Sequence, residues 1–406
     1  MRIAIISTMS LIPWGGSEEL WAAMADEALS EGHEVIILYY DWPTTPSKIA
    51  SLCRRGARIL KRPLPRPRSL KQRIFARLRT STPFVPPPPS EYQAIFDLKP
   101  DVICISHGGA YDCAYELALL KLLYASSAPY VIVNQYLDAN YIYIFHETLR
   151  DRSRELYARA ACVAFVSQQN AAVAERQLAR PIPQAVVLRN PINLSDLTVV
   201  PWPSSRSVNL ASVARLAAAH KGQDILFETL GAPMWRERDW QLRLYGEGPD
   251  RKYLEELAHY FGIAERVKFV GHVNDVRGAW RENHLLVLPS RAEGTPLALV
   301  EAMICGRPSV VTDVGGNTEW VEEMRTGFVA EAFTARSFGA ALERAWLARD
   351  RWKQIGLQAH EQALIKFDRS PGSSLLRVLL DVVHQPRVSP IDVQLTGKSF
   401  EIASVR

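Results

Sequence analysis

The segment RAEGTPLALVEAMICGRP, residues 291–308, joins two strand patterns through a helix. Before it, LLVLPS (285–290) is a short apolar run of the kind that forms a buried strand, and PSVVTD (308–313) after it is another. Thr295 can cap a helix and Pro296 suits its first position, and apolar residues then recur at helical spacing. In such a strand–helix–strand unit, the helix start faces the crevice at the carboxyl ends of the strands, where ligands bind.

Two glutamates, Glu293 and Glu301, lie on either side of this helix start. The amides of Leu297 and Ala298 have no partner within the helix, so together with the helix dipole they attract an anion, usually a phosphate. Carboxylates near a phosphate site are useful if they face hydroxyls or a developing cation beside the phosphate. A sugar nucleotide has all these parts, although two acids without any ligand fit the same spacing.

Short apolar runs alternate with helical patterns throughout the 406 residues. Continuous apolar runs are typical of parallel strands that are buried on both faces. Because eleven strands are too many for one sheet, we expect two Rossmann-like, doubly wound α/β domains. The expected strands are 2–7, 34–40, 101–106, 130–135, 162–167, 185–190, 209–214, 241–246, 267–272, 285–290 and 308–313. The expected organisation is an N-terminal domain over 1–195, a C-terminal domain over 205–370, a helix over 371–386 and a tail over 387–406.

Composition is that of a soluble globular protein, with 48% hydrophobic and 22% charged residues. The net charge of +5 is too small to indicate a nucleic-acid partner by itself. Five scattered cysteines without a CxxC pair favour core thiols in a reducing compartment. The start MRIAIIS enters a strand directly and no apolar run approaches the length of a membrane span, so we expect neither a signal peptide nor a transmembrane helix.

Residues 54–79 carry eleven lysines and arginines and no acid. Within them, 69–79 has the pattern of a basic amphipathic helix, and the proline-rich segment 83–89 that follows favours a stiff, extended chain. We interpret 54–90 as an excursion from the N-terminal domain. Its basic part can contact an anionic membrane surface, while a solvated basic face is the alternative; nucleic acid is not expected.

Glycines and cations follow two other strand patterns. Gly15 and Gly16 come after the first strand and allow a ligand to approach the backbone closely, although a tight turn alone fits them too. Arg215 and Lys221 follow the first strand of the second half, where two cations suit a diphosphate, or are simply surface charges. The sequence has no metal-ligand cluster and no Asp-x-Asp pair, so we expect fixed cations and amides to neutralise a bound diphosphate without a metal.

Taken together and in this order, the motifs resemble those of the retaining GT-B glycosyltransferases of family 4. The resemblance covers most of the chain and is strongest over 209–319. Three motifs carry it: Glu-x7-Glu at Glu293 to Glu301, Arg-x5-Lys at Arg215 to Lys221, and a glycine-rich loop at Gly15-Gly16. Further matching patterns are NPIN (190–193), YGEGPD (245–250), FVGHV (269–273) and DVGGNTE (313–319).

The resemblance implies a role for each matching residue. Arg215 and Lys221 bind the donor diphosphate and stabilise it as the leaving group. Glu293 faces the donor sugar and stabilises its cationic character, and Glu301 holds the ribose hydroxyls. The other donor-binding residues are Gly15, Gly16, Val273, Thr295, Leu297 and Ala298. The helix over 371–386 is expected to cross back to the first domain.

One departure concerns the acceptor side. Many family members carry a histidine just after the strand that corresponds to 130–135, whereas this chain has Asn134 and Gln135. Either amide can hydrogen-bond a sugar, but neither can act as a base. His107, in SHGGAYD after another strand pattern, is a candidate for part of that role, so we place His107, Asn134 and Gln135 on the acceptor side.

The function that the resemblance implies is a metal-independent, retaining transfer of a sugar from a UDP- or GDP-sugar, with no other cofactor. The expected acceptor is a hydroxyl of a glycan or lipid-linked molecule in cell-envelope or polysaccharide synthesis, at a cytoplasmic location that allows peripheral contact with the inner face of the membrane. Two alternatives keep the fold: a sugar-nucleotide epimerase or phosphorylase, and a catalytically degenerate partner subunit. The departure at Asn134 and Gln135 motivates the last, whereas the intact cations and glutamates favour the transferase.

Overall fold

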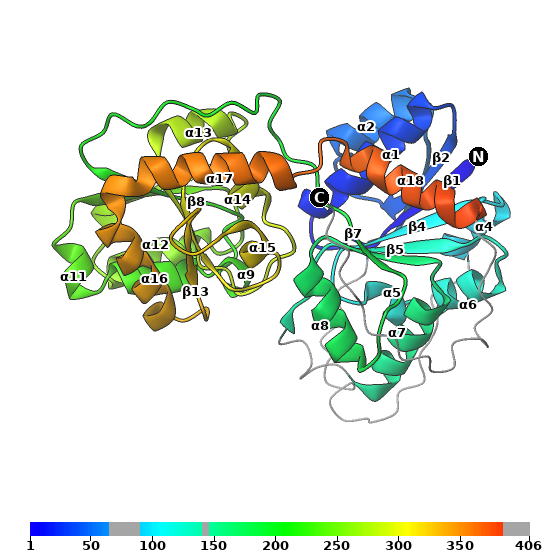
Figure 1. Ribbon diagram of the computed structural model, residues 1–406. Coiled ribbons are helices and arrows are strands. Elements are labelled where there is room, and N and C mark those ends of the chain that lie inside the picture. Colours follow the sequence, from blue (N-terminus) through cyan, green and yellow to red (C-terminus); the bar gives the residue numbers. More distant parts are fainter. Residues whose placement is uncertain (65–89, 140–145, 385–406) are drawn as a thin grey trace.

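The computed structural model describes residues 1–64, 90–139 and 146–384, which form two α/β domains side by side (Figure 1). Each domain is built on a parallel sheet with helices on both faces, so the expected doubly wound architecture is confirmed. The first sheet has the strand order β3-β2-β1-β4-β5-β6-β7, and the second has β10-β9-β8-β11-β12-β13. In both sheets the order reverses beside the first strand, at β1 and β8, which is where such folds open a crevice for ligands.

The strands are short and follow the apolar runs of the sequence. In the first sheet they are β1 (Arg2–Ser7), β2 (Glu34–Tyr40), β3 (Arg58–Arg62), β4 (Val102–His107), β5 (Tyr130–Asn134), β6 (Cys162–Phe165) and β7 (Ala185–Val187). In the second they are β8 (Val208–Val213), β9 (Trp240–Tyr245), β10 (Val267–Gly271), β11 (Leu285–Leu288), β12 (Ser309–Thr312) and β13 (Phe328–Ala330).

Helices connect the strands and cover the faces of the sheets. Those of the first domain are α1 (Gly16–Ser30), α2 (Ser47–Arg54), α4 (Ser90–Asp97), α5 (Asp112–Tyr115), α6 (Leu117–Ala125), α7 (Glu147–Arg159) and α8 (Gln168–Leu178). Those that follow are α9 (Ala218–Lys221), α10 (Gln223–Leu230), α11 (Pro233–Arg236), α12 (Arg251–Tyr260), η2 (Ala264–Arg266), α13 (Val276–Glu282), α14 (Leu297–Ile304), α15 (Asn317–Trp320), α16 (Ala335–Leu347), η3 (Arg349–Arg351), α17 (Trp352–Lys366) and α18 (Pro371–His384).

Each sheet separates two apolar clusters, because successive side chains of a strand point to opposite faces. In β1, Ala4 and Ile6 belong to one cluster, whereas Ile3 and Ile5 belong to the cluster on the other face. All four side chains are fully buried. Burial on both faces explains why these strands read as continuous apolar runs and holds their carboxyl ends in place for the site.

Two edge strands were not expected from the sequence. β13 has only three residues. β3 lies in the basic segment 54–90, which we interpreted as an excursion, but residues 58–62 pair with β2 and belong to the sheet. Arg62 is 2% exposed, its Nη2 donates to the Ser7 carbonyl at 2.8 Å, and its guanidinium lies over the Tyr40 ring. The predicted helix at 69–79 and the proline-rich run at 83–89 lie outside the described residues.

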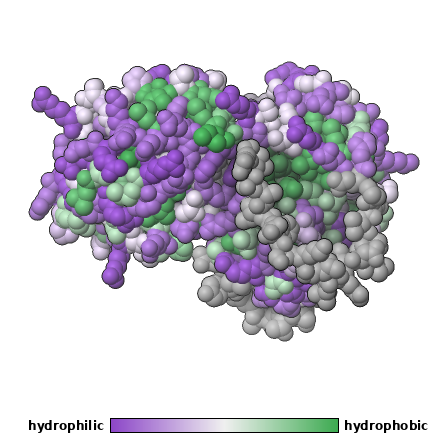
Figure 2. Space-filling model, viewed as in Figure 1, coloured by the Kyte–Doolittle hydropathy of each residue, from purple (hydrophilic) through white to green (hydrophobic). Residues whose placement is uncertain are grey.

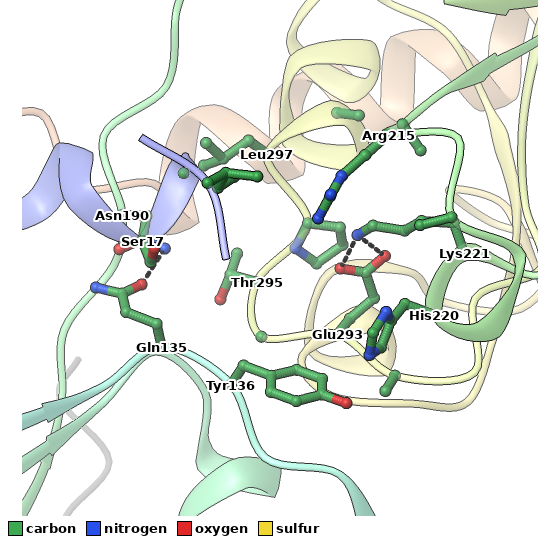
Figure 3. Close-up of a pocket in the computed structure, with 18 of the residues that line it drawn as sticks. Ser17, Gln135, Tyr136, Asn190, Arg215, His220, Lys221, Glu293, Thr295 and Leu297 are labelled. Atoms are coloured by element: carbon green, nitrogen blue, oxygen red, sulfur yellow. Dashed lines mark hydrogen bonds and ion pairs between the residues drawn. The ribbon is translucent and has the colours of Figure 1, made fainter. Parts of the chain in front are cut away.

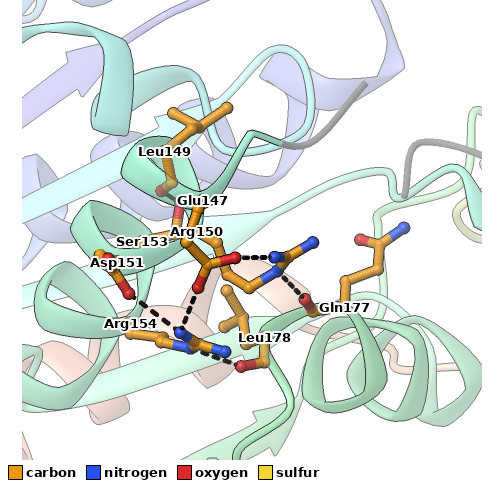
Figure 4. A network of polar contacts seen from close by, with 8 residues as sticks. All are labelled: Glu147, Leu149, Arg150, Asp151, Ser153, Arg154, Gln177 and Leu178. Atoms are coloured by element: carbon orange, nitrogen blue, oxygen red, sulfur yellow. Dashed lines mark hydrogen bonds and ion pairs between the residues drawn. The ribbon is translucent and has the colours of Figure 1, made fainter. Parts of the chain in front are cut away.

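Helices α7 and α8 are joined by a polar network at the outer layer of the first domain (Figure 4). Arg154 Nε donates to the Leu178 carbonyl at 2.7 Å, and Arg150 Nε donates to the Gln177 carbonyl at 3.1 Å. Glu147 accepts from both arginines, which holds their side chains in place. Because the last carbonyls of a helix have no partner within it, these arginines anchor the carboxyl end of α8. The opposite end of α8 faces the second domain.

The chain returns to the first domain after α17, where α18 lies against α1 (Figure 1). The two backbones approach closely at Gly372, because a Cβ there would lie 2.7 Å from the carbonyl of Ala23. Leu375, Leu376 and Leu379 of α18 are buried in the same apolar cluster as α1. The predicted tail at 387–406 lies outside the described residues.

The outer surface is mainly hydrophilic on the face shown in Figure 2, with hydrophobic groups over α13 and the end of α17. Ile365, near the end of α17, is 84% exposed. In the described part of the chain, no helix is both long enough and apolar enough to cross a membrane.

Candidate active site

A cavity of about 420 Å³ lies between the two domains. The first domain contributes the segments that follow β1, β4, β5 and β7, and the second contributes those that follow β8 and β11. All of these segments leave the carboxyl ends of parallel strands, as expected for ligand sites in doubly wound folds. Eight of the residues predicted for the site line this cavity: Gly16, Gln135, Arg215, Lys221, Glu293, Thr295, Leu297 and Ala298.

Lys221 and Glu293 form an ion pair in the cavity wall (Figure 3). The Lys221 ammonium donates to both carboxylate oxygens at 2.7 and 2.8 Å, and the Ser290 hydroxyl donates to one of them at 2.7 Å. Glu293 is 5% exposed, so the carboxylate is held almost entirely by these partners. The turn after Lys221 depends on Gly222, whose φ is +66° and whose position leaves no room for a Cβ beside the Pro289 carbonyl.

Arg215 enters the same cavity from the segment after β8, near the Lys221–Glu293 pair (Figure 3). Its backbone carbonyl accepts from Gln223 Nε2 at 2.8 Å, which fixes the segment against α10. Two cations and one carboxylate therefore meet at one end of the cavity. With a single acid between them, the two cations leave one positive charge for an anionic ligand.

Two helix starts face each other across the cavity. α14 begins at Leu297 with Pro296 as its N-cap, one residue later than the sequence predicted, and Thr295 does not cap it. Instead, the Thr295 hydroxyl donates to the Val166 carbonyl of the other domain at 2.5 Å. Opposite, the start of α1 comes so near that a Cβ on Gly16 would lie 3.5 Å from the Leu297 side chain. The unpaired amides of two helix starts favour an anion between them.

Glu301 and Val273, predicted to hold the ribose and the base, do not line this cavity, and neither does Gly15. Glu301 is 4% exposed, and one carboxylate oxygen accepts from the backbone amide of Asn193 at 3.0 Å. Burial raises the pKa of Glu301, and the hydrogen bonds from Asn193 oppose this rise. The carboxylate thus binds the segment that connects the two domains.

His107 and Asn134 lie behind the cavity wall and not on it. His107 Nδ1 and Asn134 Oδ1 are 3.1 Å apart, and the Tyr157 hydroxyl donates to the same Asn134 oxygen at 2.6 Å. Both residues are 1% exposed, and burial lowers the pKa of His107. Of the three residues predicted for the acceptor side, Gln135 therefore lines the cavity, whereas His107 and Asn134 do not.

Among the other residues that line the cavity, those with polar side chains were not predicted for the site: Ser17, Tyr136, Asn190 and His220 (Figure 3). Asn190 Nδ2 donates to Gln135 Oε1 at 2.8 Å, which ties the connecting segment to the end of β5. The Tyr136 and His220 rings, from different domains, meet edge to face with their centroids 6.0 Å apart. Two features of the sequence could have indicated these residues as part of the site: Tyr136 follows the end of a strand, and His220 directly precedes Lys221.

Direct contacts join the two domains beside the cavity. Glu319 accepts from the backbone amide of Gln169, at the start of α8, at 3.1 Å and pairs with Arg189 at 2.9 Å. Gly294 lies so close to the first domain that a Cβ on it would be 2.1 Å from the Gln135 carbonyl. The domains are therefore closed over this side of the cavity.

Solved structures with the same architecture cover nearly the whole chain. The crystal structure of Anabaena Alr3699/HepE in complex with UDP is 19% identical, covers 94% of this chain and 100% of that chain, and has a TM-score of 0.68. Sucrose-phosphate synthase from Thermosynechococcus elongatus is 17% identical, covers 94% and 99%, and has a TM-score of 0.71. These likenesses establish the fold, which is that of the two-domain GT-B proteins.

Family models match both domains. Residues 14–196 match the model described as Glycosyltransferase Family 4, and residues 207–347 match the model described as Glycosyl transferases group 1. The chain therefore belongs to the group 1 glycosyltransferases of the GT-B fold, and the predicted family is confirmed.

Curated relatives match over shorter segments. N-acetyl-alpha-D-glucosaminyl L-malate synthase of Bacillus anthracis is 32% identical over 133 residues, which are 32% of this chain and 34% of that protein. Alpha-D-kanosaminyltransferase of Streptomyces kanamyceticus is 33% identical over 129 residues, which are 31% and 33% of the two chains. The matched part spans about a third of the length of these relatives.

Proposed function

We propose that this protein transfers a sugar from a nucleoside-diphosphate sugar to a hydroxyl acceptor, without a metal and with retention at the anomeric carbon. The observation that carries the proposal is the meeting of Arg215, Lys221 and the start of α14 in one cavity, with Glu293 beside them. Cations and helix amides suit a diphosphate, and a carboxylate next to them suits sugar hydroxyls or positive charge on the sugar.

The diphosphate is the leaving group, and its departure builds up negative charge. Arg215, Lys221 and the amides of Leu297 and Ala298 are in place before the reaction, and such preorganised groups commonly supply the largest part of catalysis. Lys221 is paired with Glu293, so the carboxylate holds the ammonium in position until phosphate oxygens share it. Glu293 is then free to interact with the sugar.

Retention follows if the acceptor hydroxyl attacks the face that the phosphate leaves. The anomeric C–O bond to the phosphate breaks, a new bond forms to the acceptor oxygen, and the hydroxyl proton passes to the departing phosphate. The acceptor side supports this route, because the Gln135 amide is not basic. Burial, together with the charges of Asp138 and Glu293, raises the pKa of Tyr136 and keeps its phenol protonated.

The donor extends beyond the cavity wall in this proposal. The ribose lies towards Glu301 and the base towards Val273, as the family resemblance implies. Structures with UDP and with UDP-glucose are known for Anabaena Alr3699/HepE, which favours a uridine nucleotide here, with a guanosine nucleotide as the other candidate.

The acceptor in this proposal is a glycan or lipid-linked molecule of cell-envelope or polysaccharide synthesis. The Vi polysaccharide biosynthesis protein of Salmonella typhi, which is 38% identical over 89 residues, supports a polysaccharide context.

Peripheral contact with an anionic membrane is part of the proposal. The exposed residues Arg54 and Arg58 support it, because basic side chains attract anionic headgroups. Arg55 and Lys61 are exposed too, but they pair with Asp26 and Asp41.

A thermal-shift experiment with UDP-glucose, UDP-N-acetylglucosamine and GDP-mannose, all in EDTA, tests the proposal. We expect one donor to raise Tm in EDTA, because a ligand that binds only the folded state stabilises it. Lys221→Met should lose most of that ligand-induced shift, and turnover should fall by roughly 10²-fold, as when an oxyanion donor is lost. Lys252→Met is the matched control, since Lys252 lies on α12 with its side chain 88% exposed.

Three results would contradict the proposal. A shift that disappears in EDTA and returns with Mg²⁺ argues against metal independence. An unchanged shift in Lys221→Met argues against the assignment of the diphosphate site. If no donor shifts Tm, the donor-binding function itself is excluded for these nucleotides.

A further inference from the structure

Two aromatic rings from opposite domains meet in the wall of the cavity. Tyr136 follows β5 of the first domain, and His220 belongs to α9 of the second. Their ring centroids are 6.0 Å apart and their planes make an angle of 84°, which is a favourable edge-to-face arrangement. Both residues line the cavity, and Figure 3 shows them at the same end as the Lys221–Glu293 pair.

His220 is fixed to the part of the second domain that carries the charged residues. Its backbone carbonyl accepts from the amide of Arg291 at 2.8 Å and from the amide of Ala292 at 3.4 Å, just before Glu293. The Arg291 guanidinium in turn binds both carboxylate oxygens of Asp224 at 2.7 Å. The backbone of His220 therefore has a fixed position next to the segment that carries Glu293.

Tyr136 is fixed by the contacts of its neighbour, Gln135. The Gln135 side chain accepts from Asn190, and its carbonyl lies directly against Gly294 of the other domain. In the arrangement that the structure describes, these contacts hold the backbone next to Tyr136 against the second domain. The aromatic wall is therefore complete in the closed arrangement that the structure describes.

The rings and the ion pair form surfaces of different chemistry at one place. A pyranose ring has hydroxyl groups around its edge and patches of C–H groups on its faces. Glu293 and Lys221 can bind the hydroxyls, whereas aromatic rings offer the C–H groups an apolar surface. Tyr136 keeps this character because burial raises the pKa of its phenol, as do the nearby acids Asp138 and Glu293.

Resting on the proposed function, we propose that Tyr136 and His220 form the wall against which the transferred sugar packs, and that they determine which sugar the donor carries. Tyr136 contacts the sugar and not the nucleotide, because the cations that bind the diphosphate belong to the second domain, whereas Tyr136 belongs to the first. The ring, and not the hydroxyl, supplies the contact. A nucleoside diphosphate without its sugar does not contact this wall.

Calorimetric affinities for UDP against UDP-glucose, and for GDP against GDP-mannose, test the inference. We expect the wild type to bind one nucleotide sugar more tightly than the matching nucleoside diphosphate. In Tyr136→Ala that gain should fall by roughly 3- to 10-fold, the size of one aromatic contact, with the nucleotide affinity unchanged. Tyr136→Phe should keep the gain and His220→Ala should reduce it. Tyr260→Ala, at a tyrosine 79% exposed on α12, should leave it unchanged.

The outcomes separate this inference from the proposed function. If wild type binds neither UDP nor GDP, the donor-binding function fails, and this inference fails with it. If a nucleotide binds but its sugar adds no affinity, or if Tyr136→Ala keeps the full gain, only the aromatic wall is excluded. If Tyr136→Phe loses the affinity gained from the sugar, as Tyr136→Ala does, the aromatic wall is also contradicted, because the hydroxyl and not the ring would then contact the sugar.

Discussion

Glu18 is a buried acid directly behind the part of α1 that lines the cavity. Its side chain is 3% exposed, and a carboxylate oxygen accepts from the Trp21 indole at 2.7 Å. Burial raises its pKa from 4.5 to about 7, and hydrogen bonds from Ser7, Trp21 and Ser17 oppose this rise. The folded chain therefore binds this proton more tightly than the unfolded chain does.

Stability should consequently fall as pH rises from about 4.5 to about 7, the interval between the unfolded and folded pKa values of Glu18. Glu18→Gln cannot ionise and keeps an acceptor for Trp21. The free energy of unfolding of this variant should therefore exceed that of the wild type by an amount that grows as pH rises. This difference in the free energy of unfolding is about 3 kcal/mol at most. Denaturant unfolding at pH 4.5, 6 and 8 measures this difference, and Glu256→Gln, at an exposed acid, is the control. A difference that does not depend on pH would contradict the raised pKa of Glu18.

At the level of elements, the turn before α14 brings the two domains together. Gly294 and Thr295 precede the helix, and both touch the first domain, through the Gln135 carbonyl and the Val166 carbonyl. The same turn positions Glu293 on one side and the amides of the helix start on the other. One short segment thus serves the site and the closure of the domains together.

Gly294→Ala should prevent this approach, because its Cβ would lie 2.1 Å from the Gln135 carbonyl and 2.8 Å from a Val166 methyl group. Overpacking of this kind costs about 1–3 kcal/mol, so transfer should slow by roughly 10-fold or more. Nucleotide binding to the second domain should persist. Gly339→Ala is the control, since its Cβ meets only a Thr229 methyl group at 3.5 Å. Equal turnover in both variants would show that closure tolerates the added methyl group.

For the whole molecule, closure depends on a few polar contacts between the domains. Glu319 joins the start of α8 and Arg189, and the Arg189 guanidinium also donates to the Val166 carbonyl at 3.2 Å. Arg189 also lies over the Trp320 ring. The Glu319 and Arg189 side chains are only 16% and 21% exposed, which makes their attraction stronger than that of a surface pair.

Removing the charge of Glu319 should shift the unliganded protein towards an open arrangement. We expect Glu319→Gln to increase the open population by roughly 10-fold, as hydrogen bonds to charged groups contribute about 1.5 kcal/mol or more. Small-angle scattering should then show a larger radius of gyration. Glu322→Gln, whose partners Arg325 and Lys366 both belong to the second domain, should leave the radius unchanged. An unchanged radius in Glu319→Gln would mean that other contacts hold the domains closed.

The sequence alone determined the class of fold and the family, and both are confirmed. All eleven expected strands are present, because continuous burial on both faces of a parallel sheet leaves a local apolar pattern. Strands with weaker patterns escaped notice: β13 is too short, and β3 carries three basic residues among its five. The motifs were recognisable for the same reason, since each lies in one short segment at a strand end.

The tertiary structure alone decided which of these residues meet. Thr295 could have capped α14, but its hydroxyl binds Val166, and Glu301 accepts from Asn193. Tyr136 and His220 come from different domains, and no local pattern indicates their contact. Such pairings depend on how two domains close on each other, a property of distant segments and their packing, whereas strands and helix starts are encoded by neighbouring residues.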